Sequence, residues 1–391
     1  MSGDTPGALS GIRVLELTHA IAGPHTGQIL ADHGADVIKV EPPGGELARD
    51  ALPTVDGDST YFAAQNRGKR SVVLDLKQPS DLAAFLRLVE GADVVVTNYS
   101  VDVPKRLGWD FDVLASVNPS IIMARITGFG TTGADRAMLA YDGIIQAMSG
   151  IPHMTGPRDG DPTFIAPFVA DHLAAYRATM SVLMALRVRD TAREPAPQFI
   201  DIDMISTYMG VLAHDVDESL SGRPHMRDGN RVPKATSNTY ATQDGFVHLA
   251  PVGPGPWERF CHVIGRPDWA ETVSYEDAVL EVRDDIDAYV ADWCRDRERD
   301  AILEQLQALS IPCGPVLALD EAVRRLDERA DGRVVRVTSP AGRSVAVPGP
   351  FTPVGLAGGA GRLRVPRLGE HDDEVLSPIR AELAGRGTDP D

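Results

Sequence analysis

Short hydrophobic runs alternate with amphipathic stretches through the first half of the chain. Six runs predict buried strands, and they begin at Ile12, Asp36, Ser71, Ala92, Ser120 and Gln198. Helical spacing is predicted between them, over about residues 20–33, 80–90 with Ser80 as N-cap, 103–107, 169–188 and 205–220. Apolar strands separated by helices are typical of a parallel sheet covered by helices. We therefore predict an α/β domain in this half.

The pattern changes after residue 220. Residues 221–237 are polar, basic and rich in glycine and proline, which predicts a linker. Two short strands are then expected around a Gln243-Asp244-Gly245 turn. Helices are then expected over residues 256–264, 279–295 and 301–310. A β-hairpin over residues 333–349 and a last helix over residues 372–383 are expected near the end of the chain. Residues 238–325 are therefore predicted to form a smaller α+β domain.

Composition and charge exclude several classes of protein. The 391 residues are 43% hydrophobic and 24% charged, which is not the composition of a disordered chain. The formal net charge of −18 argues against binding to nucleic acid or to an anionic membrane surface. Three scattered cysteines predict neither a disulfide framework nor a thiolate zinc site, and favour a cytoplasmic setting. No signal peptide or membrane-spanning run is recognised.

A local excess of basic residues stands out against the acidic total. Residues 66–70, Asn-Arg-Gly-Lys-Arg, hold three cations, and Lys77, Lys105 and Arg106 follow near expected strand ends. Ligands of α/β sheets bind beyond the carboxyl ends of the strands. The run could equally be a solvated charged surface, but its position favours an anion-binding site.

A glycine-rich segment, Gly128-Phe-Gly-Thr-Thr-Gly133, follows the predicted strand from Ser120. Its spacing matches a dinucleotide-binding fingerprint, which gives a nicotinamide-dependent oxidoreductase as one hypothesis. The strand is not the first of the sheet, however, and no acidic residue ends a second strand about 20 residues later. A turn that needs glycine for its backbone geometry is the alternative interpretation.

Other catalytic motifs are missing from the sequence. It contains no HExxH, GxSxG or Walker A pattern, so we predict no metal site and no serine-hydrolase site. Asp171 lies near the start of the long helical stretch, after Pro167. An aspartate there is usually an N-cap, but a carboxylate can also serve as a nucleophile. Spacing alone leaves both roles open.

Several segments in order along the chain resemble the class III CoA-transferases, the family of formyl-CoA and carnitine CoA-transferases and of the related α-methylacyl-CoA racemases. They read LSGIRVLELTHAIAGPHTGQILADHGADVIKVEPPGGELAR from Leu9, then NRGKRSVVLDLK, ADVVVTNY, KRLG, ITGFGTTG, AYDGIIQAMSG, TFIAPFVAD, IPCGPVLALDEA and VPRLGEHDDEVL. The resemblance implies a large Rossmann-like domain built from residues 1–220 and 326–391. It also implies an interlocked dimer.

The resemblance implies an enzyme that moves coenzyme A from an acyl-CoA to a carboxylic acid, with no tightly bound cofactor. Asp171 would be the catalytic carboxylate, acting through an aspartyl mixed anhydride and an aspartyl-CoA thioester. The implied contacts to coenzyme A are His19, Ala20, Ile21, Leu74, Lys77, Asn98, Tyr99, Arg106 and Tyr141. A glycine-rich lid in the family corresponds to Val252-Gly-Pro-Gly-Pro256, where two prolines fix φ.

Two alternatives remain within the family. In the racemases a His-Asp pair occupies the position of Tyr141-Asp142, and tyrosine is a poor base at neutral pH. We therefore predict a transferase rather than a 2-methylacyl-CoA racemase. The other alternative is a non-catalytic subunit of a heteromer, against which the presence of Asp171 speaks. The donor and acceptor acids are not predicted.

Overall fold

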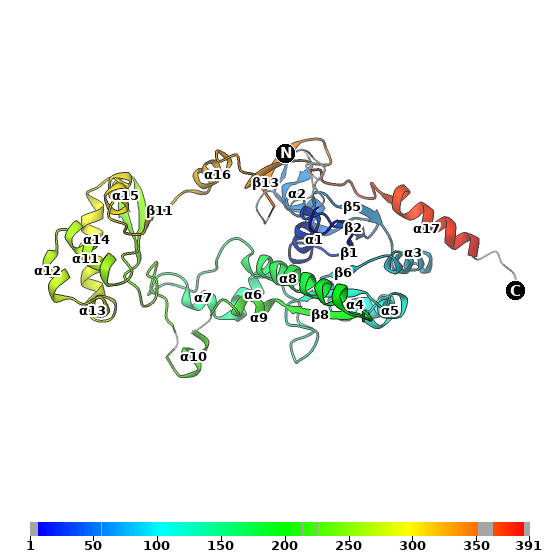
Figure 1. Ribbon diagram of the computed structural model, residues 1–391, viewed down its shortest axis with the longest axis horizontal. Coiled ribbons are helices and arrows are strands. Elements are labelled where there is room, and N and C mark those ends of the chain that lie inside the picture. The colour runs from blue at the N-terminus through cyan, green and yellow to red at the C-terminus, as the bar shows by residue number, and fades with distance from the viewer. Residues whose placement is uncertain (1–6, 56, 213–214, 224, 351–362, 387–391) are drawn as a thin grey trace. The chain divides into compact units, whose positions relative to one another are not determined.

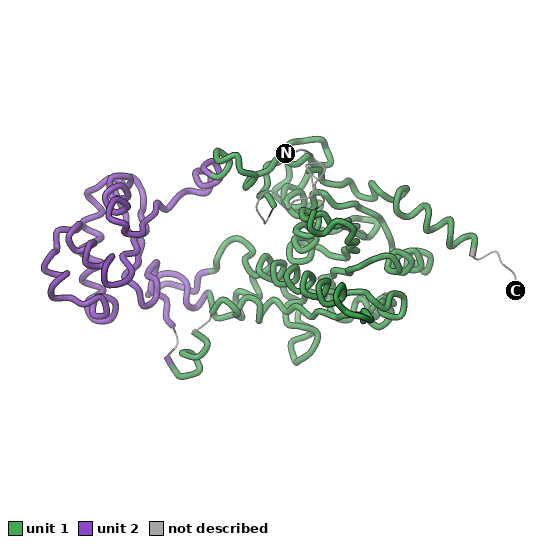
Figure 2. Tube along the Cα trace, in the orientation of Figure 1, with its two compact units in different colours: residues 1–151, 164–222, 326–391 green, residues 152–163, 223–325 purple. Residues whose placement is uncertain are grey.

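The computed structural model describes residues 7–55, 57–212, 215–223, 225–350 and 363–386. The chain divides into two compact units (Figure 2). The first contains residues 1–151, 164–222 and 326–391, and the second contains residues 152–163 and 223–325. None of the described helices is both long and apolar enough to cross a membrane.

The first unit is built on a six-stranded sheet with the order β5-β2-β1-β6-β7-β8. Every neighbouring pair of strands is parallel. The strands are β1 (Arg13–Leu17), β2 (Asp36–Glu41), β5 (Arg70–Val73), β6 (Val94–Thr97), β7 (Ile122–Thr127) and β8 (Gln198–Asp203). All six predicted strands are confirmed. Their order is that of Rossmann-type sheets, in which the chain changes direction between the two central strands.

Helices cover both faces of this sheet (Figure 1). On one face, α1 (Ala22–Asp32) and α8 (Val169–Thr191) bury Leu30 and Val182 against strand residues. On the other, α3 (Pro79–Glu90), α5 (Phe111–Val117) and α17 (Asp372–Arg386) pack around Phe85 and Trp109. Because both faces are buried, the central strands read as continuous apolar runs rather than alternating ones.

Shorter elements complete the first unit. They are η1 (Leu47–Asp50), β3 (Thr54–Val55), β4 (Asp58–Ser59), α2 (Thr60–Asn66), α4 (Val103–Leu107), α6 (Asp142–Ser149), α9 (Met204–Met209) and α10 (Asp215–Leu220). The helix expected over 205–220 is thus two helices, and residues 213–214 between them lie outside the described residues. The expected Ser80 N-cap is wrong. Helix α3 begins at Pro79 after Gln78, because proline is preformed for the first helical position.

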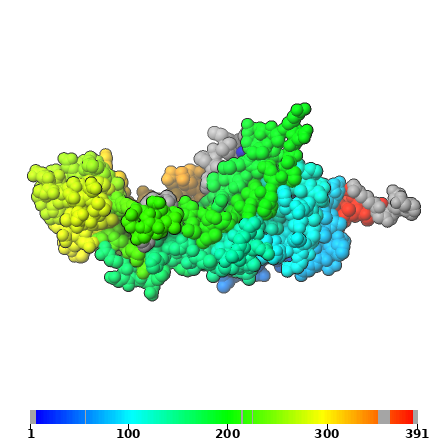
Figure 3. All heavy atoms as spheres, turned by 90° about the horizontal axis from the view of Figure 1, so that it is seen from below, coloured from blue at the N-terminus to red at the C-terminus, as the bar shows by residue number. Residues whose placement is uncertain are grey.

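The second unit has its own apolar core, around Trp257, Phe260 and Leu306. Its antiparallel sheet has the order β11-β10-β9. Its elements are α7, which spans Ile151–Met154 at the boundary, β9 (Asn238–Thr242), β10 (Gly245–Leu249), α11 (Pro254–Val263), α12 (Pro267–Thr272), α13 (Tyr275–Leu280), α14 (Arg283–Arg295), α15 (Arg299–Gln307) and β11 (Cys313–Pro315). The helices of residues 254–307 form a compact body, yellow in Figure 3.

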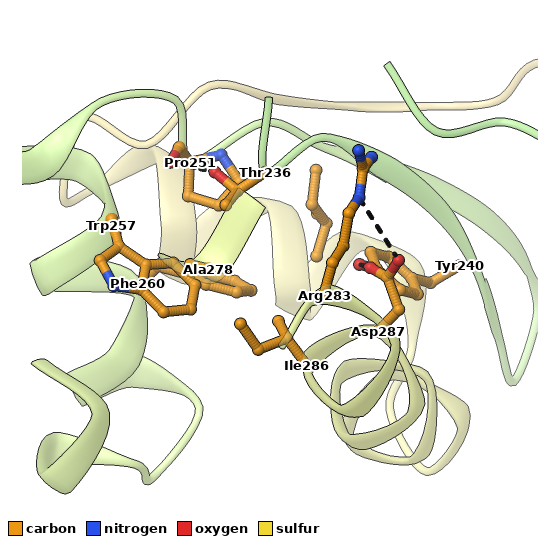
Figure 4. A pocket seen from close by; sticks show the side chains of 10 residues that line it. Thr236, Tyr240, Pro251, Trp257, Phe260, Ala278, Arg283, Ile286 and Asp287 are labelled. Carbon is orange, nitrogen blue, oxygen red and sulfur yellow. Dashed lines mark hydrogen bonds and ion pairs between the residues drawn. The ribbon is translucent and has the colours of Figure 1, made fainter. Parts of the chain in front are cut away.

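Two features of the second unit bear on its expected role. In the predicted lid segment, Val252 to Pro256, Gly253 is the N-cap of α11 with φ 95°, and Pro254 to Pro256 form the first turn of that helix. A cavity of about 10 Å³ lies between Trp257, Phe260 and the Arg283–Asp287 pair (Figure 4). Such a volume holds about one water molecule, so this cavity is too small for a substrate.

The chain then returns to the first unit. Helix α16 (Leu319–Asp327) leads to the predicted hairpin, whose strands are β12 (Val334–Thr338) and β13 (Ser344–Pro348). Val337 and Val345 of the hairpin pack on Phe62 of α2. Helix α17 contributes Val375 and Leu376 to the core beneath the sheet.

The basic run of residues 66–70 does not form the expected anion site. Arg67 is paired with Asp32 at 2.5 Å, Lys69 with Glu16 at 2.7 Å, and Arg70 with Asp36 at 2.5 Å and with Glu374 at 2.9 Å. Each cation therefore neutralises a carboxylate from a distant part of the chain. Among the described residues, Lys77, Lys105 and Arg106 are exposed and have no ion-pair partner.

Three fully buried charges lie beneath helix α1. Glu16 accepts a hydrogen bond from Lys39 at 2.9 Å and lies 2.7 Å from the Lys69 ammonium. Burial alone would raise the pKa of Glu16, but the two lysines outweigh burial and hold that pKa below its usual value. We call Glu16, Lys39 and Lys69 the buried ion cluster.

Gly27 lets α1 rest directly on this cluster. A Cβ atom at Gly27 would lie 1.7 Å from the Glu16 Oε2 atom. We therefore expect Gly27→Ala to lower the free energy of unfolding by about 1–3 kcal/mol or more, as overpacking of a core does. Urea denaturation measures the change. Gly385→Ala is the matched control, because an added Cβ atom there would meet nothing within 4 Å. Equal stability of the two variants would contradict the expectation.

Candidate active site

The site forms where the central strands β1 and β6 end. The chain leaves these two strands in opposite directions along the sheet, which opens a crevice at their carboxyl ends. Asn98 bridges the crevice: its Oδ1 accepts from the His19 N–H at 2.9 Å, and its Nδ2 donates to the His19 carbonyl at 2.8 Å. The rings of His19 and Tyr99 stack, with their centroids 5.6 Å apart. Three predicted coenzyme A contacts therefore lie together.

A tight turn connects β1 to α1. Ala20 has φ 63°, in the left-handed region that alanine seldom adopts, and its N–H donates to Glu46 Oε2 at 3.1 Å. Ile21 is the N-cap of α1, so Ala22 carries the first free N–H of the helix. Pro24 has no N–H to offer. The start of α1 thus presents a small number of donors and the positive end of the helix dipole.

Asp171 faces this helix start. It lies in the first turn of α8 and accepts a hydrogen bond from the Ala22 N–H. The N-cap of α8 is Phe168, with φ 22°, so the role of N-cap for Asp171 is wrong. The carboxyl group is largely removed from solvent. Burial, and secondarily the neighbouring charge of Asp142, raises the pKa of Asp171 to about 7, while the Ala22 bond opposes the rise.

Asp142 holds the start of α8 in place. It is 5% exposed, its Oδ1 accepts from the Ala170 N–H at 2.8 Å, and its Oδ2 accepts from Gln146 Nε2 at 2.5 Å. Gln146 in turn bonds to both backbone groups of Ile165 at 2.9 Å. The segment before α8 is therefore anchored to α6, which fixes the position of Asp171.

Aromatic and imidazole rings surround the nucleophile candidate. Tyr61 of α2 packs on the Phe168 ring, and burial with the nearby Asp171 charge raises the pKa of Tyr61. His172 Nδ1 bonds to the Phe168 carbonyl at 2.8 Å. The His172 ring meets His25, and burial next to His172 lowers the pKa of His25 to about 4. His25 is thus neutral at pH 7.

The remaining predicted contacts lie further from this centre. Leu74 follows β5 and its side chain is buried in the core, so a ligand could meet it through the backbone. Lys77 lies in the turn between β5 and α3, and Arg106 lies on α4, both exposed. Tyr141 precedes Asp142 as the N-cap of α6 and is 63% exposed. No contact joins Leu74, Lys77 or Arg106 to Asp171 in the described structure.

Sequence reasoning did not single out Glu46, Tyr61 or Asp142 as site residues. Asp142 could have been found from its place beside Tyr141, since the racemases have a functional pair there. Glu46 and Tyr61 belong to stretches with no spacing signal, and they reach the site through the short elements η1 and α2.

The Gly128–Gly133 segment lacks the context of a dinucleotide fingerprint. It follows β7, the fifth strand of the sheet along the chain, and the next helix, α6, begins only at Asp142. The fingerprint requires a helix directly after the turn, because its N-terminus binds the pyrophosphate. Instead Thr131 donates from both N–H and hydroxyl to Asp201. The loop is therefore tied to β8, and the hypothesis of an oxidoreductase is not supported.

The charge of Asp142 gives a testable effect on pH dependence. We expect Asp142→Asn to move the acid limb of the pH profile of kcat/KM to lower pH. Removal of that charge lowers the pKa of Asp171 from about 7 toward its ordinary 3.8. Activity assays between pH 4 and 9 would show the shift. An unchanged limb would mean that Asp171 does not control it.

Comparison with known proteins identifies the family of this chain. Residues 9–372 match the family described as CoA-transferase family III. The chain is 36% identical to a succinate–glutarate CoA-transferase of Agrobacterium fabrum over 95% of each chain. It is 34% identical to a succinyl-CoA:mesaconate CoA-transferase of Haloarcula hispanica over 98% of each, and 32% identical to a formyl-CoA:oxalate CoA-transferase of Rhodopseudomonas palustris over 95% of this chain and 93% of the relative.

Solved structures show the same fold. A CaiB/BaiF family protein from Brucella suis has a TM-score of 0.83 and 30% identity, covering 97% of this chain and 100% of its own. A protein from Mycobacterium tuberculosis has a TM-score of 0.82 and 26% identity, covering 95% of this chain and 100% of its own. Full-length similarity, rather than one motif, supports the assignment. The chain belongs to family III of the CoA-transferases, and it is a CoA-transferase enzyme.

Proposed function

We propose that Asp171 is the nucleophile of CoA transfer from an acyl-CoA thioester to a carboxylic acid. One observation carries the proposal: a carboxylate, largely removed from solvent, receives the first N–H of α1 at the crevice between β1 and β6. A raised pKa makes an ionised carboxylate a stronger nucleophile. At neutral pH a sizeable fraction of Asp171 is still ionised.

The reaction would proceed by four acyl transfers. An Asp171 oxygen attacks the donor thioester carbonyl, the C–S bond breaks, and CoA thiolate leaves a mixed anhydride. The thiolate attacks the Asp171 carbonyl carbon and releases the donor acid, which leaves an aspartyl-CoA thioester. The acceptor carboxylate attacks that thioester and releases CoA thiolate. The thiolate then attacks the acceptor carbonyl of the second anhydride and frees Asp171.

Backbone groups support these steps. The Ala22 N–H would stabilise negative charge that develops on the aspartyl carbonyl, because a helix start favours anions. The acyl-aspartyl intermediates hydrolyse in water, so burial of the site protects them. The family resemblance implies a lid, and the residues that correspond to it in this chain are Val252 to Pro256.

Coenzyme A would lie along the carboxyl ends of β5, β1 and β6. We propose that His19, Ala20 and Ile21 line the pantetheine end beside Asp171, together with Asn98, Tyr99 and Tyr141. Lys77 and Arg106 would bind the phosphates, since both residues are exposed and their side chains form no ion pair with the described residues. Leu74 would contribute its backbone.

Short dicarboxylic acids are the first acceptors to test. The named relatives act on succinate with glutarate, on mesaconate and on oxalate. We further propose an interlocked homodimer, on the family resemblance. The free thiols of Cys261, Cys294 and Cys313 agree with the proposed cytoplasmic setting.

Mass spectrometry of the enzyme mixed with acyl-CoA donors tests the proposal. Succinyl-CoA, glutaryl-CoA and formyl-CoA are each added, and intact and peptide masses are measured with and without hydroxylamine. We expect an acyl or CoA adduct on the peptide that contains Asp171, and its removal by hydroxylamine. Turnover without any adduct on this peptide would contradict the proposal.

The racemase alternative predicts a different result. Exchange of the α-proton of a 2-methylacyl-CoA into heavy water, with no CoA transfer to any acid, would replace the transferase proposal. Tyr141 occupies the place of the racemase histidine and is exposed at the helix start, which favours the transferase.

A further inference from the structure

We propose that Glu46 is a positioning residue of the reaction, whose carboxylate fixes the turn from Thr18 to Ala22 so that the Ala22 N–H meets Asp171. The inference rests on the proposed function, because it takes Asp171 as the nucleophile. It adds a residue whose side chain contacts Ala20, Ala48 and Lys39 rather than Asp171.

The Glu46 carboxylate is buried and contacts the turn after β1, helix η1 and Lys39. It is 5% exposed and immediately precedes η1. Its Oε2 accepts from the Ala20 N–H at 3.1 Å and from the Ala48 N–H at 3.0 Å. Its Oε1 has no hydrogen-bond partner in the described part of the chain and lies 3.5 Å from the Lys39 ammonium. One carboxylate thus joins η1, the turn and the buried ion cluster.

The turn needs such support because of its backbone conformation. Ala20 has φ 63°, which is unfavourable for a residue with a Cβ atom. Lys39 holds the preceding Thr18 carbonyl at 3.3 Å, and Asn98 holds both backbone groups of His19. Glu46 holds the strained residue itself. Without its acceptor, Ala20 would relax toward negative φ, and Ala22, two residues later, would turn away from Asp171.

Loss of the Ala22 bond has a chemical signature. That bond favours the ionised form of Asp171 against burial. Asp142 of α6 and Tyr61 of α2 face Asp171 from other helices, and both stay in place in Glu46 variants. Burial lowers the pKa of His19 and raises that of Tyr61, the Glu46 charge acts to raise both, and Glu46→Asp keeps that charge. A turn that relaxes should therefore raise the pH at which Asp171 ionises.

The test compares Glu46→Ala, Glu46→Asp and Glu46→Gln with Asp50→Ala, an exposed neighbour at the end of η1. The readouts are kcat and KM for the CoA donor between pH 5 and 9. We expect Glu46→Ala and Glu46→Asp each to lower kcat by roughly 10²-fold, as loss of one oxyanion donor does, with a small change in KM. The acid limb should move to higher pH. Gln keeps the acceptor oxygen, so it and Asp50→Ala should stay near wild type.

These outcomes separate positioning from folding. A variant that is only less stable loses turnover together with folded protein, so circular dichroism at each assay pH distinguishes unfolding from a shift of the limb in protein that stays folded. Glu46→Asp keeps the charge beside Lys39 and shortens the reach, so it replaces Glu46→Ala if the latter does not fold. Wild-type kcat in both, or equal loss in Glu46→Gln, would overturn the inference. Failure of the proposed function would appear separately, as turnover that survives Asp171→Asn.

Discussion

Asp171→Asn should reduce CoA transfer by on the order of 10⁴-fold or more, as loss of a covalent nucleophile does. The amide cannot form the mixed anhydride, although its oxygen can still accept from the Ala22 N–H. Adducts on the peptide should disappear with the activity. Turnover by coupled assay and adduct formation by mass spectrometry measure both effects on the same sample.

The same variant should stay folded and bind coenzyme A. Because the pKa of Asp171 rises from 3.8 to about 7 on folding, ionisation of this carboxyl destabilises the folded state progressively between those pH values. At pH 8 the Asn variant should therefore be at least as stable as wild type in thermal unfolding. Wild-type turnover, or a loss of activity that follows unfolding, would remove Asp171 from the proposed role.

Glu16→Gln should be the most destabilising single change to a charge in the first unit. It leaves the Lys39 ammonium buried without this carboxylate, and it removes the charge that holds a proton on Lys69, whose pKa burial already lowers to about 8. Removal of one partner from a buried ion pair costs about 3–5 kcal/mol, because an uncompensated charge stays buried. Urea unfolding at pH 7 measures the loss in free energy of unfolding.

Two comparisons sharpen that test. Glu90→Gln removes one partner of the exposed Arg87–Glu90 pair and should cost at most about 1 kcal/mol. The low pKa of Glu16 means that its contribution is complete above 4.5, its unfolded value, and is lost as pH falls through the lower folded value. The gap between wild type and Glu16→Gln should therefore narrow in acid. A constant gap, or a cost equal to that of Glu90→Gln, would refute the role of the cluster.

Much of the first unit could be predicted from the sequence because its strands are buried on both faces. A continuous run of β-branched residues such as Val94–Thr97 in β6 strongly favours a buried strand. Helix α16 was not predicted, since it is amphipathic but has no buried residue in the described chain. Strand β11 has three residues and pairs with β10 only in the folded unit. The helix expected over 279–295 is divided after Leu280, where α13 ends and α14 begins at Arg283.

The site was less predictable, since its contacts join distant residues. Asp171 was found through the family resemblance, while its neighbours Asp142, Tyr61 and Ala22 come from three other helices. The contribution of residues 66–70 to the expected anion site was wrong for the same reason: the sequence shows a cluster of cations but not the carboxylates that pair with them from elsewhere in the chain. The sequence shows which charged residues are present, whereas ion pairs formed in the folded structure determine which of them remain available to a ligand.

The buried ion cluster also limits how this sequence can change. Glu16 serves two lysines, and Lys39 in turn holds the Thr18 carbonyl at the active-site turn. Substitutions at these positions are therefore interdependent, and a tolerated change must replace all three together. Apolar residues of similar volume can replace a buried ion group without loss of stability. A redesign on that basis would gain a simpler core only if it also supplied a new donor to Thr18.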